Sequence, residues 1–383
     1  MSTDAQLAVV PARASTRTSD SMRNCISFVV LASLSVMGCS SSSSESAKSD
    51  AQYQSEVVKG MHDDLLGKLS DLVTAARNLQ SAAPVTAGRG WDSAEDATAI
   101  AAMKVAWDHA RSAYEHIEGA IAPLFPDVDT AIDARYDDFL ARLSPNGDAY
   151  LFDDQGVTGM HAMERILYAN LTPERVVQFE STLLGYAPAA FPATELESSD
   201  FKNRLCAKLV SDTQGLHDTW QAASNYDLDA AFQGLIALMN EQREKVDKAS
   251  TNEEESRYSQ TTLQDLRNNL AGTRDVYALF QPWLRSKTGK IGPDAAHDGI
   301  SVNTMIEGGF QSLDTLYSAV PGDAVPPTPA DWSSANPTPA DAATPFGMLY
   351  IGVRDAVDAN RPGSVVEEMN LAAALLGFPE FVE

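Results

Sequence analysis

The chain has 383 residues, of which 44% are hydrophobic, and its formal net charge is −25 at pH 7. This length and apolar content are enough for one large or two medium globular domains with buried cores. Such an acidic surface repels nucleic acid and has no electrostatic attraction to anionic lipid, whereas it attracts cations. The composition therefore argues against a nucleic-acid-binding protein and suits a soluble protein that attracts cations.

The amino terminus has the features of an export signal. A basic residue precedes an apolar stretch from Ile26 to Met37, which is too short to span a membrane comfortably but suits the core of a signal peptide. The stretch ends in SVMGC before five serines, which resembles a bacterial lipoprotein box with Cys39 as the lipidated residue. We expect residues 1–39 to form this lipoprotein signal, with Met1 or Met22 as the start. An ordinary signal peptide or a short buried helix is the alternative.

The cysteines limit how the mature chain is stabilised. If Cys39 is acylated and Cys25 is removed with the signal peptide, Cys206 is the only thiol left. Such a chain can form neither an intramolecular disulfide nor a thiolate metal cluster. We therefore expect its stability to come from the hydrophobic core.

Helical patterns follow one another after a polar, serine-rich tether at residues 40–52. No run alternates with period two for long enough to predict a strand. Asp92 with Glu95 predicts a capping box, and Thr172 with Pro173 predicts another helix start. The expected helices cover residues 52–82, 92–122, 127–143, 158–170, 197–223, 227–249, 257–284, 298–319, 346–359 and 364–376.

These patterns predict an all-α fold of two helical bundles. We place the first bundle at residues 53–250 and the second at 251–383, with a Pro-rich loop at 321–345. ARSAYEHIEGAIAPL from Ala110 resembles AGTRDVYALFQPWL from Ala271 in its Arg, Tyr and closing Pro. An internal duplication, with the chemistry kept in the first half, is one interpretation, and chance likeness between helices is the other.

Two carboxylates lie one turn apart on the predicted helix around Glu115. Glu118 lies on the flank of an apolar stripe that we expect to face the core, and Arg111 lies between the two carboxylates. A carboxylate beside a buried stripe needs a partner, because burying a lone charge is costly. That partner is either Arg111, at salt-bridge spacing from Glu115, or a metal ion shared with other helices.

A second polar pair occurs in TGMHAMERIL, where His161 precedes Glu164 by three residues. On a helix these two side chains share a face, and together they can ligate one cation, as in metal sites of helical bundles. A surface pair or a hydrogen-bonded pair is the alternative. None of the six histidines forms H-E-x-x-H or H-x-x-E-H, so the usual helical zinc-peptidase layouts are absent.

Several segments in order resemble one known group of proteins. GMHAMERIL resembles the G-x-H-x-x-E motif of the imelysin-like superfamily, which includes imelysin peptidases and the EfeO/EfeM iron-uptake lipoproteins. ARSAYEHIE, LFPDVDTAIDARYDDF and EEESRYSQTTLQDLRNNLAGTRDVYALFQPWL are similar to the EfeO/EfeM branch, and the similarity spans about Tyr53 to Leu284. Because only a serine tether precedes Tyr53, we expect the shorter EfeM-like form, without the cupredoxin-like domain of EfeO.

The resemblance implies two helical bundles and a metal site. The implied ligands are His161 and Glu164 with Glu115 and Glu118, and Asp133 is a further acidic candidate. Carboxylate oxygens with one imidazole suit Fe2+ or Fe3+, while the lack of thiolates argues against Cu(I). Zn2+ or another divalent cation could occupy the same ligands.

We therefore expect an exported, lipid-anchored metal-binding protein that acts in iron uptake. Its implied partners are an iron permease and a haem peroxidase, and only the lipid anchor would hold it to a membrane. It would lie on the periplasmic side of an outer membrane or on the outer face of a cytoplasmic membrane.

Two alternatives from other functional classes stay open, and no catalytic residue is assigned. One is an imelysin-type metallopeptidase with Glu164 as general base. Its weakness is the number of ligands, because catalytic zinc usually has three protein ligands and an open water position. The other is a module that binds a peptide or a polysaccharide and uses the metal only for stability.

Overall fold

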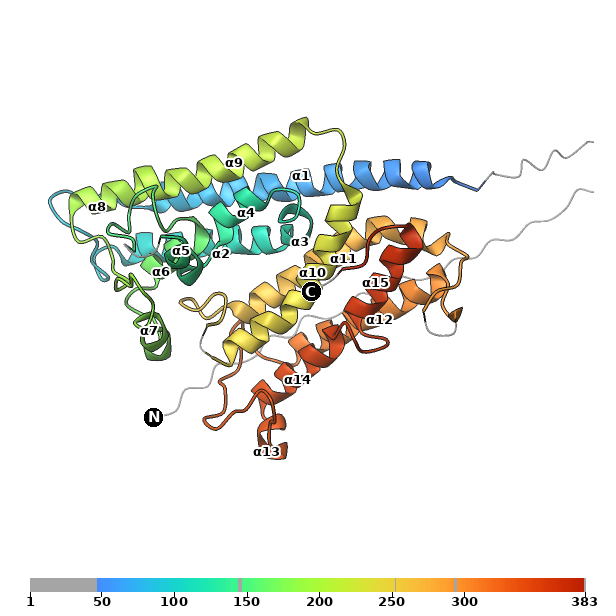
Figure 1. Ribbon diagram of the computed structural model, residues 1–383. Helices are drawn as coiled ribbons and strands as arrows, with labels where there is room; N and C mark the ends of the chain where they lie inside the picture. Colours follow the sequence, from blue (N-terminus) through green and yellow to red (C-terminus); the bar gives the residue numbers. More distant parts are fainter. Residues whose placement is uncertain (1–46, 144–146, 252, 293–294, 382–383) are drawn as a thin grey trace, which may run out of the picture. The chain divides into compact units, whose positions relative to one another are not determined.

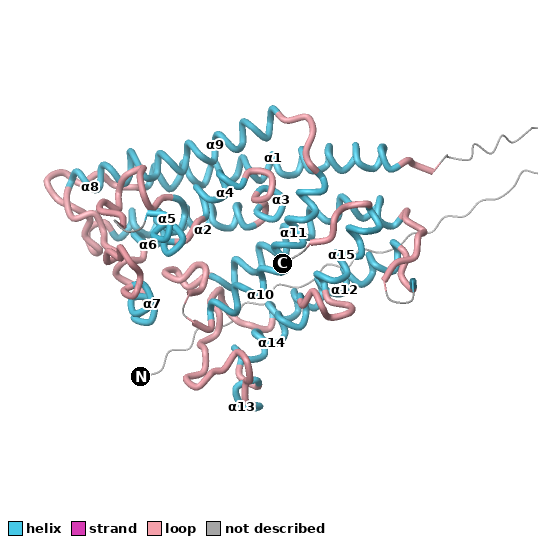
Figure 2. Tube along the Cα trace, viewed as in Figure 1, coloured by secondary structure: helices cyan, strands magenta, loops and turns pink. Residues whose placement is uncertain are grey.

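Helices and their connecting loops make up the part of the chain that the computed structural model describes, residues 47–143, 147–251, 253–292 and 295–381. Figure 2 shows this composition along the Cα trace. These residues contain no strand, only an isolated bridge between Ile291 and His297. The all-α prediction is therefore confirmed. Among the same residues, no helix is long and apolar enough to cross a membrane.

Several of the predictions made from the sequence are not tested by the described structure. The expected signal peptide and Cys39 lie outside the described residues, as does the tether up to residue 46. The internal duplication and the division into two bundles at residue 250 stay predictions. Cys206 lies within the described part of the chain, where its thiol is buried and free.

The long helix α1 (Asp50–Ala82) begins at a capping box. Ser49 accepts a hydrogen bond from the Gln52 backbone N–H, and the Gln52 side chain accepts one from the Ser49 N–H. These two bonds satisfy backbone donors that the first turn would otherwise leave unpaired. Buried residues recur every three or four positions along the helix, and this stripe packs against α2 (Ala97–Glu115) and α9 (Cys206–Ala222) (Figure 1).

The helix predicted over residues 92–122 is two helices, so its bounds were wrong. The Asp92 carboxylate accepts hydrogen bonds from the backbone N–H groups of the next turn, and α2 starts only after Asp96. The helix then stops before His116, and a short helix α3 (Glu118–Ile121) follows. Helix α11 (Thr262–Arg285) approaches this break closely, because a Cβ at Gly272 would overlap the His116 carbonyl oxygen.

The helix predicted over residues 127–143 is likewise interrupted, at Ala134. It forms α4 (Pro126–Asp133) and α5 (Tyr136–Leu143). Helix α6 (Gly159–Leu167) is buried along its whole length and packs against α4. Gly159 has a φ of +80°, and a Cβ there would lie 2.5 Å from the Ile132 carbonyl oxygen. Only glycine fits this contact, which brings the first turn of α6 beside the end of α4.

The remaining long helices form a second group of mutually packed elements. Helix α10 contacts α3, α11 and α14, while α12 packs against α11 and α15 (Figure 1). Buried apolar residues from both groups belong to one hydrophobic core. The helices predicted here agree with the observed bounds within two residues: α10 (Leu228–Ala249), α12 (Gly299–Ser318), α14 (Pro345–Val357) and α15 (Val365–Leu376).

Shorter elements complete the fold. The predicted helix at 197–223 contains a π-helical turn at Phe201–Leu205, which joins α8 to α9. A helix starts near Pro173 as expected, but Pro173 is the residue before its first turn, and the Thr172 hydroxyl donates to the Tyr168 carbonyl oxygen instead of capping the helix. These elements are α7 (Glu174–Glu180), α8 (Glu195–Asp200) and, after the Pro-rich loop, α13 (Pro339–Ala342).

Candidate metal centre

Three side chains from separate elements place ligand atoms within 4.8 Å of one another: Asp133, His161 and Glu255. Asp133 ends α4, His161 lies in the first turns of α6, and Glu255 belongs to the segment between α10 and α11. The His161 Nε2 atom is 3.7 Å from an Asp133 oxygen and 3.6 Å from a Glu255 oxygen. One imidazole nitrogen with two carboxylates is a donor set that first-row divalent cations accept.

Glu164 fixes the orientation of the His161 ring. Its Oε2 atom is 3.0 Å from His161 Nδ1. Its Oε1 atom accepts hydrogen bonds from the backbone N–H groups of Tyr258 and Ser259 and from the Ser259 hydroxyl, at 3.1, 2.8 and 2.6 Å. Because an ionised carboxylate only accepts, Nδ1 must carry a proton, and the ring presents Nε2 to the other two carboxylates. Metal-binding histidines commonly have this kind of carboxylate partner.

The Nε2 atom itself is buried and has no hydrogen-bond partner. Burial and the charge of Arg111 oppose protonation of the ring, but its contacts with Glu164, Glu255 and Asp133 outweigh them and raise the pKa of His161 to about 9. Burial raises the pKa of Asp133 to about 8, against the opposing charge of Arg111. A cation that binds these two residues near neutral pH must therefore displace protons.

Arg111 lies at the centre of the surrounding charges. Its guanidinium is 2% exposed and forms close ion pairs with Glu115 and Asp133. It also reaches oxygens of Glu255 at 3.2 Å and Asp265 at 3.3 Å. Burial disfavours the charged guanidinium, but these four carboxylates outweigh it and raise the pKa of Arg111 well above its usual value.

The predicted metal ligands Glu115 and Glu118 contact the ammonium group of Lys245. Lys245 Nζ lies 3.3 Å from a Glu115 oxygen and 3.8 Å from a Glu118 oxygen, and Glu118 also accepts a 2.8 Å hydrogen bond from the Asn269 amide. Burial raises the pKa of Glu118 well above its usual value, against the opposing charge of Lys245. The Arg111–Glu115 ion pair that the sequence offered as an alternative to a metal is present. Both glutamates lie outside the three-residue cluster.

Sequence reasoning did not single out Glu255, although it falls in the EEESRY segment that carried the family resemblance. Burial opposes its ionisation, but Lys245, His161 and Arg111 outweigh this and hold the pKa of Glu255 well below its usual value. Glu255 is therefore a charged ligand candidate at neutral pH. Helical periodicity could not find it, because it lies between two helices rather than on a helix face.

An acidic pocket of about 250 Å³ reaches two of the three clustered residues, Asp133 and Glu255. Carboxylates outnumber basic side chains in its lining, so its field favours entry of a cation. The acidic residues of its wall are Glu118, Asp129, Asp133, Asp138, Glu241, Glu244 and Glu255, and the basic ones are Arg135, Arg142 and Lys248.

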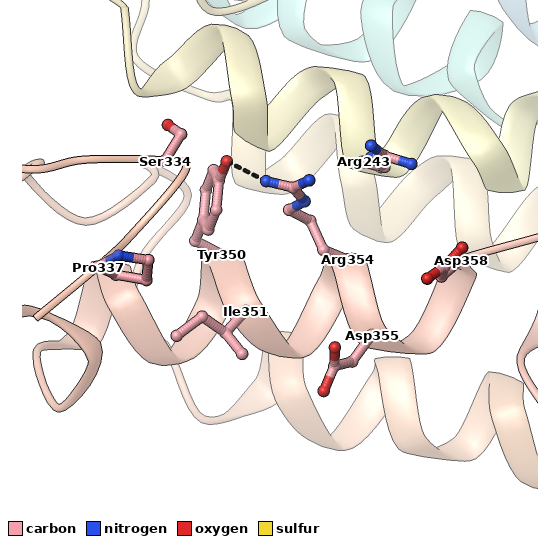
Figure 3. A pocket seen from close by; sticks show the side chains of 8 residues that line it. All are labelled: Arg243, Ser334, Pro337, Tyr350, Ile351, Arg354, Asp355 and Asp358. Carbon is pink, nitrogen blue, oxygen red and sulfur yellow. Dashed lines mark hydrogen bonds between the residues drawn. The ribbon is translucent and has the colours of Figure 1, made fainter. Parts of the chain in front are cut away.

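A second pocket, of about 280 Å³, lies between α10, α14 and the Pro-rich loop (Figure 3). None of the sequence-predicted site residues lines it. Arg354 donates a 2.6 Å hydrogen bond to the Tyr350 hydroxyl, and Arg243 lies on the neighbouring helix. With two guanidinium groups and two aspartates on its wall, this pocket lacks the acidic excess of the first.

Residues 65–295 match the sequence profile of the imelysin family, described as "Peptidase_M75: Imelysin", and this match covers more than half of the chain. The chain belongs to the imelysin family. The matched segment contains the three clustered residues together with Glu115, Glu118 and Glu164. The family resemblance predicted from GMHAMERIL and its neighbouring segments is thereby confirmed.

The chain is also similar to proteins named "Efem/EfeO family lipoprotein" from Staphylococcus aureus strains MSSA476, MW2 and USA300. Each is 25% identical over 225 residues, which is 57% of this chain and 64% of the relative. The matched part of the chain thus spans somewhat less than two thirds of these relatives' length. They support placement in the EfeO/EfeM branch of imelysin-like proteins.

Proposed function

We propose that this imelysin-family protein binds iron through Asp133, His161 and Glu255 and acts as a metal-binding lipoprotein in iron uptake. The observation that carries the proposal is the buried Nε2 atom of His161, which has no hydrogen-bond partner and faces two carboxylates. Oxygen donors with one imidazole suit Fe2+ and Fe3+, and Zn2+ or Mn2+ would accept the same donors. Glu164 has the role of orienting His161 rather than binding the cation itself.

The charge balance around these ligands supports a cationic cargo. Seven carboxylates lie no farther than 3.8 Å from Arg111, Lys245 or His161. Two permanent positive charges and one imidazole are too few to pair with all of them, and burial raises the pKa of Glu118, Asp133, Glu241 and Asp265, so protons must offset part of the excess negative charge. A divalent or trivalent ion would offset this excess. The carboxylates are Glu115, Glu118, Asp133, Glu164, Glu241, Glu255 and Asp265.

The role in iron uptake rests on the similarity to the EfeM/EfeO lipoproteins. In that role, Cys39 would anchor the mature chain to a membrane through its lipid. The protein would hold iron outside the cytoplasm and pass it to an iron permease, and a haem peroxidase of the same uptake system is a further proposed partner. Replacement of Cys39 by alanine should release the protein from the membrane fraction without unfolding it.

The metallopeptidase alternative requires Glu164 to act as a general base. In the structure, one Glu164 oxygen accepts three hydrogen bonds and the other contacts His161 Nδ1, on the side of the ring away from Nε2. A general base needs a free lone pair within reach of the proton that it abstracts. These contacts favour the orienting role. Chelator-sensitive cleavage of a denatured protein by the purified chain would support the enzyme instead.

Calorimetric titration with Fe2+ under anaerobic conditions tests the proposal. Wild type should bind one ion, and His161→Ala should weaken binding at least a hundredfold. His217→Ala is a matched control, because His217 also contacts a neighbouring carboxylate, at 3.0 Å, but is not part of the three-residue cluster. The control should bind like wild type. Equal affinity of wild type and His161→Ala would refute the proposed site.

A further inference from the structure

We propose that Arg111 is a built-in competitor of the bound cation, which limits the affinity of the site and eases release of the metal. This inference rests on the proposed function, because it concerns the same three ligands. It assigns Arg111 a role other than ligand or simple structural ion pair. The guanidinium would set how tightly the cargo is held.

The competition follows from shared atoms. The Arg111 Nη1 group pairs with Asp133 Oδ1, and its Nη2 group lies 3.2 Å from Glu255 Oε1. These same two oxygens lie 3.7 and 3.6 Å from His161 Nε2. A cation that joins the three ligands must therefore take lone pairs that the guanidinium now uses. It must also come close to a fixed positive charge, and repulsion at such distances is strong in a buried site.

Arg111 keeps two other carboxylate acceptors when a cation takes its contacts with Asp133 and Glu255. Its Nη2 group also pairs with Glu115 Oε1, and its Nε group lies 3.3 Å from Asp265 Oδ1. The Ser256 hydroxyl holds the other Asp265 oxygen at 2.6 Å, which keeps that carboxylate in place. The guanidinium can therefore exchange one pair of carboxylates for a cation and keep the other pair. The Arg111 guanidinium therefore stays paired with carboxylates after the cation binds.

This arrangement suits a protein that must release what it binds. With Arg111 between the carboxylates, the site stays assembled before a cation arrives, because the acidic groups do not repel one another freely. When the cation leaves, the guanidinium recovers its former contacts, so release costs less than it would from an uncompensated cluster. We expect the affinity to be lower, and dissociation faster, than the three ligands alone would give.

The test compares Mn2+ affinity, measured by calorimetry, in wild type, Arg111→Lys and Arg111→Met. Arg111→Met should bind Mn2+ at least tenfold more tightly, while the melting temperature of the metal-free protein falls and its rise on adding Mn2+ becomes larger. Arg111→Lys keeps the positive charge and should stay within about threefold of wild type. If Arg111→Met does not fold, the same comparison uses Arg111→Met combined with Asp265→Asn, which removes one of the uncompensated carboxylates.

Arg165→Met is the matched control, since Arg165 is equally buried but pairs with Glu180 rather than with the three ligands. It should lower the melting temperature without raising Mn2+ affinity. Unchanged or weaker binding by Arg111→Met, or equal tightening by the Lys and Met variants, would overturn the inference. A background with His161→Ala separates the two proposals. If His161→Ala binds Mn2+ as tightly as wild type, the proposed site itself fails.

Discussion

The charged cluster around Arg111 and His161 and the carboxyl-terminal helix α15 use their buried positions in opposite ways. Around Arg111 and His161, charged side chains fill the interior, and most of them contact a group of opposite charge. In α15 the buried positions are valine, alanine, methionine and leucine, apart from Glu368. The first region buries charge, which is costly, around the candidate metal centre, while the second supplies ordinary hydrophobic stability. If the proposed metal site is correct, mutations in the two regions should affect stability and metal binding separately.

The largest expected effect comes from a cavity in the apolar region. Phe310 on α12 is fully buried and packs edge-on against Tyr277, with ring centroids 5.6 Å apart. Phe310→Ala should lower the free energy of unfolding by about 3–5 kcal/mol, because it removes apolar contacts and leaves a void. Under conditions where the variant is still folded, its Mn2+ affinity should equal that of wild type. Loss of metal binding in the folded variant would show that the two regions are coupled.

The pH dependence of metal binding gives the next effect. Asp133 and His161, with pKa values of about 8 and 9, carry protons at neutral pH, and a bound cation must replace them. Affinity should therefore rise with pH, by about tenfold to a hundredfold between pH 6.5 and 7.5. Calorimetry at pH 7 in buffers of different ionisation enthalpy should detect one to two protons released per ion. Binding that is independent of pH would contradict this protonation scheme.

Asp133→Asn should separate binding from stability within the site itself. Because Asp133, with a pKa of about 8, is already mostly neutral at pH 7, and Arg111 keeps three other carboxylate partners, the amide should change the stability of the metal-free protein little. Mn2+ affinity should fall at least tenfold, which is about 1.4 kcal/mol. Chemical denaturation and calorimetry on the same sample measure both quantities. A strongly destabilised variant with normal affinity would show that Asp133 is a structural residue.

Glu368 gives the smallest effect, in the apolar region. Burial and the nearby Glu367 raise its pKa to about 7, and its Oε2 atom has no hydrogen-bond partner. Since the native state holds this proton more tightly than the unfolded chain, stability should decline as pH rises from about 4.5 to 7. Glu368→Gln should remove this decline and raise the unfolding free energy at pH 8 by about 1 kcal/mol. The exposed Glu174→Gln should change neither, and an equal gain there would rule out burial as the cause.

The sequence predicted the helices better than it predicted their interruptions. Apolar periodicity is local, so α10, α12, α14 and α15 were found close to their observed ends. Both breaks lie beside close contacts with distant segments: Gly272 approaches the His116 carbonyl oxygen, and Gly159 approaches that of Ile132, two residues before Ala134. A single sequence carries no local signal for such contacts, and continuous helices were predicted at both places.

The candidate site was predicted in part for the same reason. His161 and Glu164 were recognised together because a one-turn spacing is visible in ten residues. Asp133 was predicted only through the family resemblance. Glu255 was missed, because only the packing of α4, α6 and the segment before α11 brings it close to His161. The ion pairs of Glu115 and Glu118 with Lys245 likewise join residues that are more than a hundred positions apart. Their role in binding a cation stays a prediction.

The tight contact at Gly159 makes the geometry of the candidate metal centre depend on a residue outside the three-residue cluster. The α-hydrogen of this residue faces the carbonyl oxygens of Ala131 and Ile132, so the spacing between α4 and α6 is set by the smallest side chain available. An added methyl group would act as a wedge and push the imidazole away from Asp133, while every donor atom stayed in the sequence. A folded Gly159→Ala protein would then keep a complete ligand set whose members no longer meet.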